Sequence, residues 1–367
     1  MQIAIVGLAA SGKTTVFNTL TRGHAQTGGF GGLTLNVGVV KVPDQRLDRL
    51  AEIFKPKKVV QADVTYVDLP APPASSEGHV GTEDLPAEHL ARLRDSDALL
   101  HVVRAFDDPA NPHPEGSVDP ARDLDRLDVE FMLADLALVD RRLERLKQSG
   151  RHGTPAEKEA NEREEAVIVR LKAGLEAGSP IRDVELDQDE EKAIRGFRFL
   201  TQKPVLVLLN VGESDIAGAG ERVAALTSGY DHQNALIDAL SAKIEMELGE
   251  LEPDEAVVFM EELGIAESGL DRVIVLSYRL LGLISFLTAG PDEVRAWPIR
   301  DGSNAVDAAG AIHSDLAKGF IRAETIGYAE LLTLGSMADA KKAGKLRSEG
   351  KTYRVRDGDV VEILFSR

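Results

Sequence analysis

The sequence predicts an α/β protein with a parallel sheet, an inserted pair of long helices and a small C-terminal α+β domain. Three observations predict it. Strand-like runs alternate with helical periodicity over the first 104 residues, the same rhythm resumes at residues 204–209, and two strongly capped helical patterns lie in between. Because the rhythm is alike on both sides of the helices, we expect all of these strands to belong to one sheet.

The N-terminal part reads as short strands and helices in alternation. Its elements are expected at residues 3–6, 14–21, 37–42, 64–67, 90–94 and 98–103, followed by a buried strand at residues 205–209. Together these residues are assigned to a nucleotide-binding domain of residues 1–119 and 203–281.

Residues 120–202 are predicted to form a separate inserted helical domain. Asp119 is an expected N-cap, and helical spacing of apolar residues runs from there to Gly150. Thr154 and Glu157 have the spacing of a capping box that opens a second helix, which stops at residues 178–180. Two long helices joined by a four-residue turn predict an antiparallel hairpin.

Residues 282–367 change pattern again and are predicted to be a domain of their own. A strand, a helix, a strand, a short helix and a closing hairpin are expected at residues 294–299, 305–312, 320–326, 328–332, and 352–355 with 360–365.

The composition excludes several classes of protein. Absence of cysteine from all 367 residues excludes a disulfide scaffold, a thiolate zinc site and a cysteine nucleophile. It favours a reducing compartment, and we expect a cytoplasmic location with no membrane association, since no targeting or spanning segment is recognisable. The net charge of −18 does not favour whole-molecule attraction to nucleic acid, yet residues 282–367 are balanced, with 12 basic and 12 acidic residues.

A phosphate-binding motif follows the first strand. Residues 7–14 read GLAASGKT and match G-x-x-x-x-G-K-[ST] between a strand and a helix. The glycines let the backbone wrap around phosphate oxygens, Lys13 reaches the β- and γ-phosphates, and the Thr14 hydroxyl can bind Mg²⁺. Asp68, at the end of a neighbouring strand, is expected to support that metal through a water. The motif therefore predicts a P-loop site.

Later residues are expected to bind the base. Asn210 begins a stretch that resembles the guanine-reading sequence N-K-x-D of GTPases. Val211 replaces the lysine that packs over the base, and Glu213 replaces the aspartate with a carboxylate that is one methylene longer. Residues 241–243 read SAK, similar to a loop that closes the base pocket. Guanine specificity does not follow from these residues.

The chain resembles the YchF/Obg-like ATPases nearly from end to end. The stretches that carry the resemblance are residues 38–40, 42–47, 95–98, 101–104, 210–213, 286–290, 293–297, 319–326 and 350–359. The resemblance implies a Ras-like, Obg-type G domain of the P-loop NTPase class with a helical hairpin inserted after Asp68. It also implies a C-terminal TGS domain with the ubiquitin-like β-grasp fold.

The resemblance further implies ATP in preference to GTP, with Mg²⁺, and association with ribosomes. The family lacks the usual catalytic glutamine, and His113, twelve residues after His101, is the catalytic residue that it implies. The residues expected to bind nucleotide are Ala10, Ser11, Gly12, Lys13, Thr14, Thr15, Asn210, Val211, Glu213, Ser241 and Ala242.

Departures from the family pattern keep two functions open. Residues 68–73 read DLPAPP where the family reads D-x-x-G, and Gly32 stands where a Mg²⁺-binding threonine is usual, with Thr34 two residues away. Both sensors of the γ-phosphate are thus altered, whereas the β-phosphate cradle is intact. The chain is either a ribosome-associated protein that hydrolyses ATP slowly or a non-hydrolysing nucleotide-binding scaffold.

The C-terminal domain carries the expected contact with RNA. Residues 341–356 contain seven basic residues and one acidic residue, Glu349, which is a plausible contact for a phosphate backbone, although a solvated surface would look the same. Trp297 and Tyr353 are expected to pack in the core of the domain rather than to stack on bases. ATP, ADP and the ribosome or RNA are the expected partners of a monomer.

Overall fold

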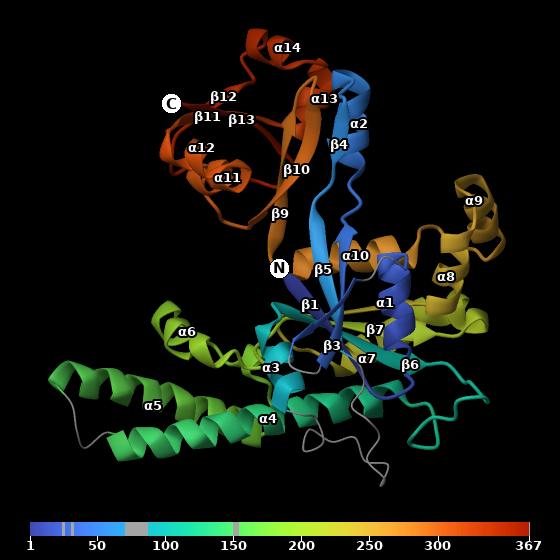
Figure 1. The fold of residues 1–367 in the computed structure, drawn as a ribbon, viewed down its shortest axis with the longest axis vertical. Coiled ribbons are helices and arrows are strands. Elements are labelled where there is room, and N and C mark those ends of the chain that lie inside the picture. The colour runs from blue at the N-terminus through green and yellow to red at the C-terminus, as the bar shows by residue number, and fades with distance from the viewer. Residues whose placement is uncertain (24–25, 31–32, 70–86, 150–153, 367) are drawn as a thin grey trace. The chain divides into compact units, whose positions relative to one another are not determined.

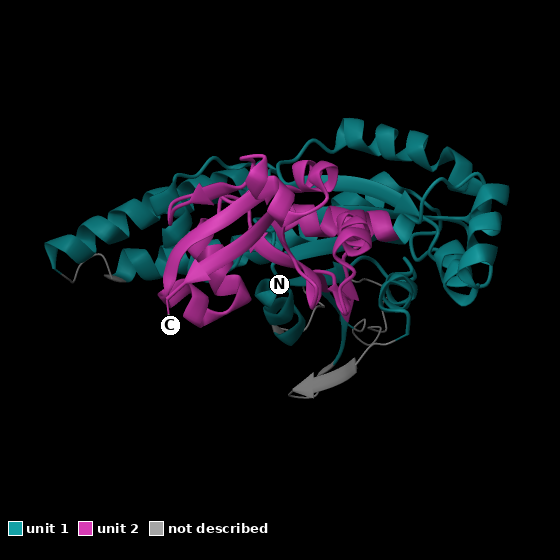
Figure 2. Ribbon diagram, turned by 90° about the horizontal axis from the view of Figure 1, so that it is seen from above, with its two compact units in different colours: residues 1–38, 65–270 teal, residues 39–64, 271–367 magenta. Residues whose placement is uncertain are grey.

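The computed structural model describes residues 1–23, 26–30, 33–69, 87–149 and 154–366. The chain divides into a larger unit of residues 1–38 and 65–270 and a C-terminal unit of residues 39–64 and 271–367 (Figure 2). None of the helices in the described ranges is long and apolar enough to cross a membrane.

A seven-stranded sheet forms the centre of the larger unit (Figure 1). Its strands, in spatial order, are β2 (Gln26–Phe30), β3 (Leu33–Lys41), β5 (Asp63–Asp68), β1 (Gln2–Val6), β6 (Ala98–Ala105), β7 (Val205–Val211) and β8 (Ala235–Leu240). From β5 to β8 all pairs are parallel, and only β2 and β3 are antiparallel among the pairs whose register is resolved. Pairing of β6 with β7 confirms that the strands before and after the inserted helices share one sheet.

Every residue of β6 and β7 is buried, as expected for central strands of a parallel sheet. The helices around the sheet include α1 (Lys13–Thr21), α3 (Ala87–Asp95), α7 (Ala219–Gly229) and α8 (Ala242–Glu250), with a 3₁₀ turn η3 (Glu213–Gly218) after β7; α9 (Pro253–Glu262) follows α8. The carboxyl ends of the parallel strands therefore meet at one edge of the sheet, which is where ligands bind in such folds.

The two long helices lie side by side, as predicted (Figure 1). They are α4 (Pro120–Ser149) and α5 (Pro155–Glu176), and they lead into η1 (Ile181–Asp183), α6 (Gln188–Ile194) and η2 (Arg195–Phe197). The predicted capping box is present, because Thr154 and Glu157 bond to each other's backbone N–H groups. Apolar residues such as Val139, Ile168 and Leu171 are fully buried between the helices. The predicted turn at residues 150–153 lies outside the described residues.

A six-stranded sheet forms the C-terminal unit. In spatial order it contains β12 (Arg347–Glu349), β11 (Phe320–Gly327), β13 (Asp359–Phe365), β9 (Leu283–Ala289), β10 (Glu293–Arg300) and β4 (Lys58–Val60). The helices of this part are α2 (Gln45–Phe54), α10 (Gly269–Leu280), α11 (Ala305–Ile312), α12 (Ser314–Lys318), α13 (Tyr328–Leu334) and α14 (Met337–Lys342).

The last strand of this unit, β13, pairs in parallel with the first long strand, β9, while β9 and β10 form an antiparallel hairpin. A hairpin, a helix packed on it and a final central strand give the β-grasp arrangement that the resemblance implied. Trp297 and Tyr353 pack against the apolar cluster that includes α11, which confirms the expected packing role.

Two features of the C-terminal unit differ from expectation. The strand predicted at residues 352–355 is wrong. Only an isolated bridge joins Arg354 to Asn304, because the Val355 N–H donates to the carbonyl of Ser303 rather than to β13. Residues 39–64, assigned from sequence to the nucleotide-binding domain, pack with the C-terminal unit, since β4 pairs with β10. The three predicted domain boundaries otherwise stay a prediction.

Candidate functional site: a phosphate loop and a base pocket

The phosphate loop connects β1 to α1 in a conformation that two glycines make possible. Gly7 and Gly12 have φ angles of +147° and +93°. A Cβ atom at Gly7 would lie 2.3 Å from the carbonyl oxygen of Val102, and one at Gly12 would lie 2.3 Å from Nδ2 of Asn210. Gly12 is also the N-cap of α1 and offers it no side-chain oxygen. The first N–H groups of the helix are therefore oriented for an anion.

Lys13 lies along this loop. Its Nζ donates hydrogen bonds to the carbonyl oxygens of Gly7 and Leu8, each at 2.8 Å. Burial lowers the pKa of Lys13 to about 8, and the attraction of Asp68 opposes that shift. A cation held in a partly dehydrated position at a phosphate loop is typical of a functional lysine.

Asp68, at the end of β5, is 2 % exposed and faces the same loop. Its Oδ2 accepts a long hydrogen bond of 3.4 Å from Asn36, and Thr14 also bonds to the carboxylate, but Oδ1 has no hydrogen-bond partner among the described residues. Burial raises the pKa of Asp68, and the bonds from Asn36 and Thr14 and the charge of Lys13 oppose this. A hydroxyl beside an incompletely bonded carboxylate suits a hard cation such as Mg²⁺.

In the described residues no three His, Asp or Glu side chains gather into a metal site. A cation at Thr14 and Asp68 would therefore take its remaining ligands from phosphate and water, as Mg²⁺ commonly does.

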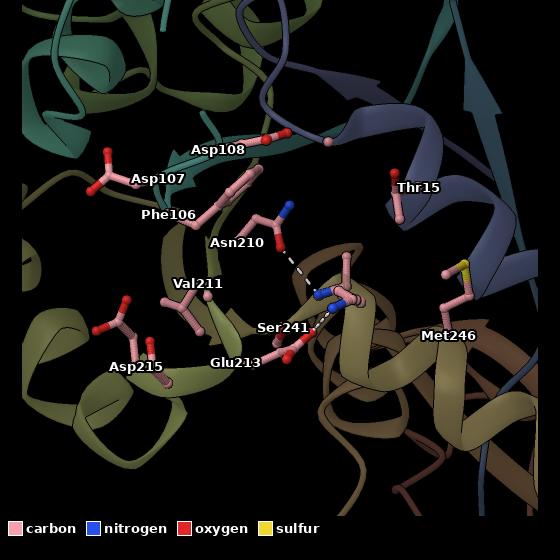
Figure 3. Close-up of a pocket in the computed structure, with 15 residues that line it drawn as sticks. Thr15, Phe106, Asp107, Asp108, Asn210, Val211, Glu213, Asp215, Ser241 and Met246 are labelled. Carbon is pink, nitrogen blue, oxygen red and sulfur yellow. Dashed lines mark hydrogen bonds and ion pairs between the residues drawn. The ribbon is translucent and has the colours of Figure 1, made fainter. Parts of the chain in front are cut away.

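A pocket of about 740 Å³ opens beside the loop (Figure 3). Its wall comprises residues at the carboxyl ends of three strands (β6, β7 and β8) and at the starts of α1 and α8: Gly12, Thr15, Phe106, Asp107, Asp108, Asn210, Val211, Gly212, Glu213, Ser214, Asp215, Ser241, Ala242, Lys243 and Met246. Seven of the predicted nucleotide-binding residues are among them.

Phe106, Asp107, Asp108 and Met246 had not been singled out from sequence. Phe106 immediately follows β6, so the argument that ligands lie at the carboxyl ends of parallel strands could have identified it. No comparable sequence signal marks Met246, because it depends on how α8 packs.

Asn210 forms hydrogen bonds with both the phosphate loop and the loop of residues 241–243. Its Nδ2 donates to the carbonyl of Ser11 at 3.1 Å. Its Oδ1 accepts from the N–H of Ala242 at 3.1 Å (Figure 3). The side chain is 5 % exposed. Asn210 therefore ties the phosphate loop to the SAK loop.

Glu213 and Lys243 form an ion pair at the rim of the pocket. Their side chains are 46 % and 64 % exposed, so the pair contributes little to stability. The hydrogen bond with Glu213 raises the pKa of Lys243. The sequence did not predict this contact between the Glu213 carboxylate and Lys243.

His113 is part of a buried hydrogen-bonded loop. Its Nδ1 accepts from the N–H of Glu115 at 3.1 Å, so Nε2 carries the proton that is donated to Asp123 at 2.8 Å. The guanidinium of Arg122 donates to the other oxygen of Asp123. Both ring nitrogens are engaged, and in this arrangement neither is available to orient a water.

Three features that bear on hydrolysis lie outside the described residues: Gly32, the side chain of Thr34 and the prolines of residues 70–73. Their predicted effects on the γ-phosphate sensors stay predictions.

Nucleotide binding should weaken above pH 8. Lys13 is largely charged at pH 7, but with a pKa of about 8 only roughly a tenth remains charged at pH 9 in the free protein. Because the phosphates need the charged form, ADP affinity should fall about tenfold between pH 7 and pH 9. Calorimetry at pH 8 in buffers of different ionisation enthalpy should also show proton uptake on binding. Equal affinities at both pH values without proton uptake would contradict this prediction.

This site consists of a glycine-rich loop at a helix N-terminus, a lysine that lies along the loop, and a pocket at the carboxyl edge of a parallel sheet. Together these features define a P-loop nucleotide-binding protein. Comparison with known proteins agrees. The family model described as "50S ribosome-binding GTPase" matches residues 2–133, and the model named YchF-GTPase_C, described as a protein of unknown function, matches residues 283–366.

Similar proteins cover the whole chain. "Ribosome-binding ATPase YchF" of Bacillus subtilis is 42% identical over 366 residues, covering 99% of this chain and 98% of that protein. The protein of the same name from Escherichia coli O157:H7 is 38% identical with the same coverage. The solved structure of the Schizosaccharomyces pombe YchF GTPase is 32% identical, with a TM-score of 0.85, and covers 99% of this chain and 97% of its own. The chain belongs to the YchF family.

Proposed function

We propose that this protein binds ATP in preference to GTP, hydrolyses it slowly and associates with ribosomes. The observation that carries this proposal is the intact phosphate loop beside a base pocket whose Glu213 carboxylate is paired with Lys243. The name of the relatives, "Ribosome-binding ATPase YchF", supports both the nucleotide and the partner.

In this proposal the phosphates lie against the backbone of residues 10–15 and the ammonium group of Lys13. Asn210 positions the base against Val211, Ser241 and Ala242, and the apolar side chains of Phe106 and Met246 add further contact. Adenine is favoured for two reasons. The lysine that packs over guanine is replaced by Val211, and Glu213 is both longer than aspartate and engaged by Lys243.

Mg²⁺ is proposed at Thr14, with Asp68 as a ligand through water. The Thr14 hydroxyl and the incompletely bonded Asp68 carboxylate fit such an ion. When bound, it would neutralise charge between the β- and γ-phosphates. A catalytic role of His113 requires its bond to Asp123 to open first, since Nδ1 already accepts from the Glu115 N–H.

Contact with ribosomal RNA is proposed through the basic stretch of residues 341–356. Three of its cations are already paired, because Lys342, Lys345 and Arg347 contact Asp339, Glu330 and Asp359 respectively. Lys341, Lys351, Arg354 and Arg356 have no ion pair among the described residues. The Arg354 guanidinium donates to the carbonyl of Gly302, so the other three are the ones proposed to contact phosphate. We further propose that the protein is a cytoplasmic monomer.

Calorimetric titration of ATP, ADP, GTP and GDP with Mg²⁺, combined with phosphate release in the presence and absence of ribosomes, tests the proposal. We expect adenine nucleotides to bind more tightly than guanine nucleotides and ribosomes to increase phosphate release. Equal ATP and ADP affinity with no release in either condition would instead identify the alternative function, a scaffold whose nucleotide is a structural ligand.

A further inference from the structure

The segment that leaves the base pocket carries an unusual surface. α8 begins at Ala242, which bonds to Asn210, and packs against α1. α9 follows α8 and lies at the outer end of this extension of the larger unit (Figure 1). No residue of α9 is buried.

The two faces of α9 differ in exposure. The inner face consists of half-buried apolar side chains at helical spacing: Ala256, Phe259, Met260 and Leu263. The outer face has the same spacing and consists of Asp254, Val257, Val258 and Glu261, all of which are exposed. Val257 is 50 % and Val258 is 55 % exposed.

About half of each of these two valine side chains is exposed to solvent. Exposed β-branched residues lower helix propensity, because they lose side-chain freedom against the preceding turn. Further burial against a partner would offset that cost, because Val257 and Val258 are only half buried in the free chain. The two adjacent valines give the outer face a small apolar area within a polar rim, an arrangement that larger interaction sites share.

The charge around these valines is of one sign. Residues 244–268 contain nine acidic residues and no lysine or arginine. Glu250, Asp254, Glu261 and Glu262 are exposed and have no ion pair within the described part of the chain. Such a surface repels the phosphate backbone of RNA and attracts lysine and arginine side chains. Charge and apolar contact together fit a basic protein segment with apolar side chains.

We propose that the outer face of α9 docks a lysine- and arginine-rich protein segment of the ribosome. The inference rests on the proposed ribosome association and names one of its contacts. In this inference α9 contacts a ribosomal protein, whereas the basic stretch of the C-terminal unit is proposed to contact ribosomal RNA. Because α8 starts at the SAK loop, the docked segment lies one helix away from the base pocket.

Cross-linking from α9 identifies the class of partner. A photoreactive amino acid is introduced at position 258 in the full chain, which is irradiated with ribosomes and sedimented. We expect adducts whose added mass survives nuclease and is identified as peptide by mass spectrometry. Adducts with RNA, or no adduct although the protein sediments with ribosomes, would overturn the inference and leave the proposed function intact. If the wild-type protein does not sediment with ribosomes, the proposed function fails, and the inference fails with it.

Matched variants measure the strength of the contact. Replacing both valines (Val257→Ser with Val258→Ser) should weaken ribosome binding about tenfold, since interface side chains that dominate binding typically cost this much or more on truncation. Glu261→Lys with Glu262→Lys should weaken it similarly. The control is Val169→Ser on α5, which makes the same substitution at a valine that is 51 % exposed and should leave ribosome affinity unchanged. ATP affinity and melting temperature should be unaltered in all variants. Unchanged ribosome affinity in both double variants would overturn the inference.

Discussion

Lys13→Ala is expected to abolish measurable binding of ATP and ADP. The Lys13 ammonium group lies at the phosphate loop, 2.8 Å from the carbonyl oxygens of Gly7 and Leu8, in a position where burial lowers its pKa to about 8. Removing one member of a dehydrated charge pair costs about 2–5 kcal/mol, which corresponds to a loss of affinity of roughly thirtyfold to several thousandfold. Isothermal titration calorimetry with each nucleotide measures this loss directly.

Folding should survive this substitution. Keeping the charged Lys13 ammonium group partly dehydrated costs free energy in the folded state. The alanine variant avoids this cost, although it also loses the two hydrogen bonds to the loop. A suitable control is Lys243→Ala, because Lys243 lines the same pocket but is 64 % exposed and pairs with Glu213. That variant should change nucleotide affinity only a few-fold. Wild-type affinity in Lys13→Ala would remove the P-loop assignment.

Asp135→Ala should cause the largest loss of stability. Asp135, on α4, is fully buried and accepts hydrogen bonds from the N–H groups of Leu200 and Thr201, at 3.1 and 2.8 Å, and from the Thr201 hydroxyl and the Arg94 guanidinium, at 2.9 and 3.1 Å. Burial raises the pKa of Asp135, and the N–H bonds of Thr201 and Leu200 oppose that shift.

Alanine at this position would leave several buried donors without an acceptor. Breaking such a buried, charged network costs about 3–5 kcal/mol. Urea unfolding should therefore show a markedly lower midpoint. The matched control is Asp140→Ala on the same helix, whose side chain is 47 % exposed and pairs with Lys172, and it should cost less than about 1 kcal/mol. Equal midpoints for the two variants would contradict the role assigned to Asp135.

Local patterns predicted most of the elements well. The helix expected at residues 305–312 begins and ends at those residues, and the capping signals at Asp119 and Thr154 located α4 and α5. These signals act within one or two turns of chain, so they can be read without a fold. The prediction of a hairpin strand at residues 352–355 was wrong, because alternation of apolar and polar residues indicates an extended segment but does not identify the strand with which it pairs.

In the candidate site, too, local sequence patterns did not identify the tertiary partners of side chains. Motif spacing identified the phosphate loop and Asn210, since the chemistry of phosphate binding requires those residue types next to one another in the chain. The ion pair of Glu213 with Lys243 joins residues far apart in sequence, and His113 bonds to Asp123 on the next helix. Neither pairing follows from residue spacing, although the first changes the role that the sequence had suggested for Glu213 and the second changes the role suggested for His113.

By itself, then, the sequence determined the class of fold, the capped helices, the phosphate loop and the family, because each depends on short-range pattern or on motifs. Only the tertiary structure decided that residues 39–64 join the C-terminal unit, that Phe106 and Met246 line the pocket beside the phosphate loop and that α9 exposes two valines among carboxylates. The physical reason is common to all three. Strand partners, pocket walls and exposure are set by contacts between distant residues, and those contacts exist only once the chain has packed.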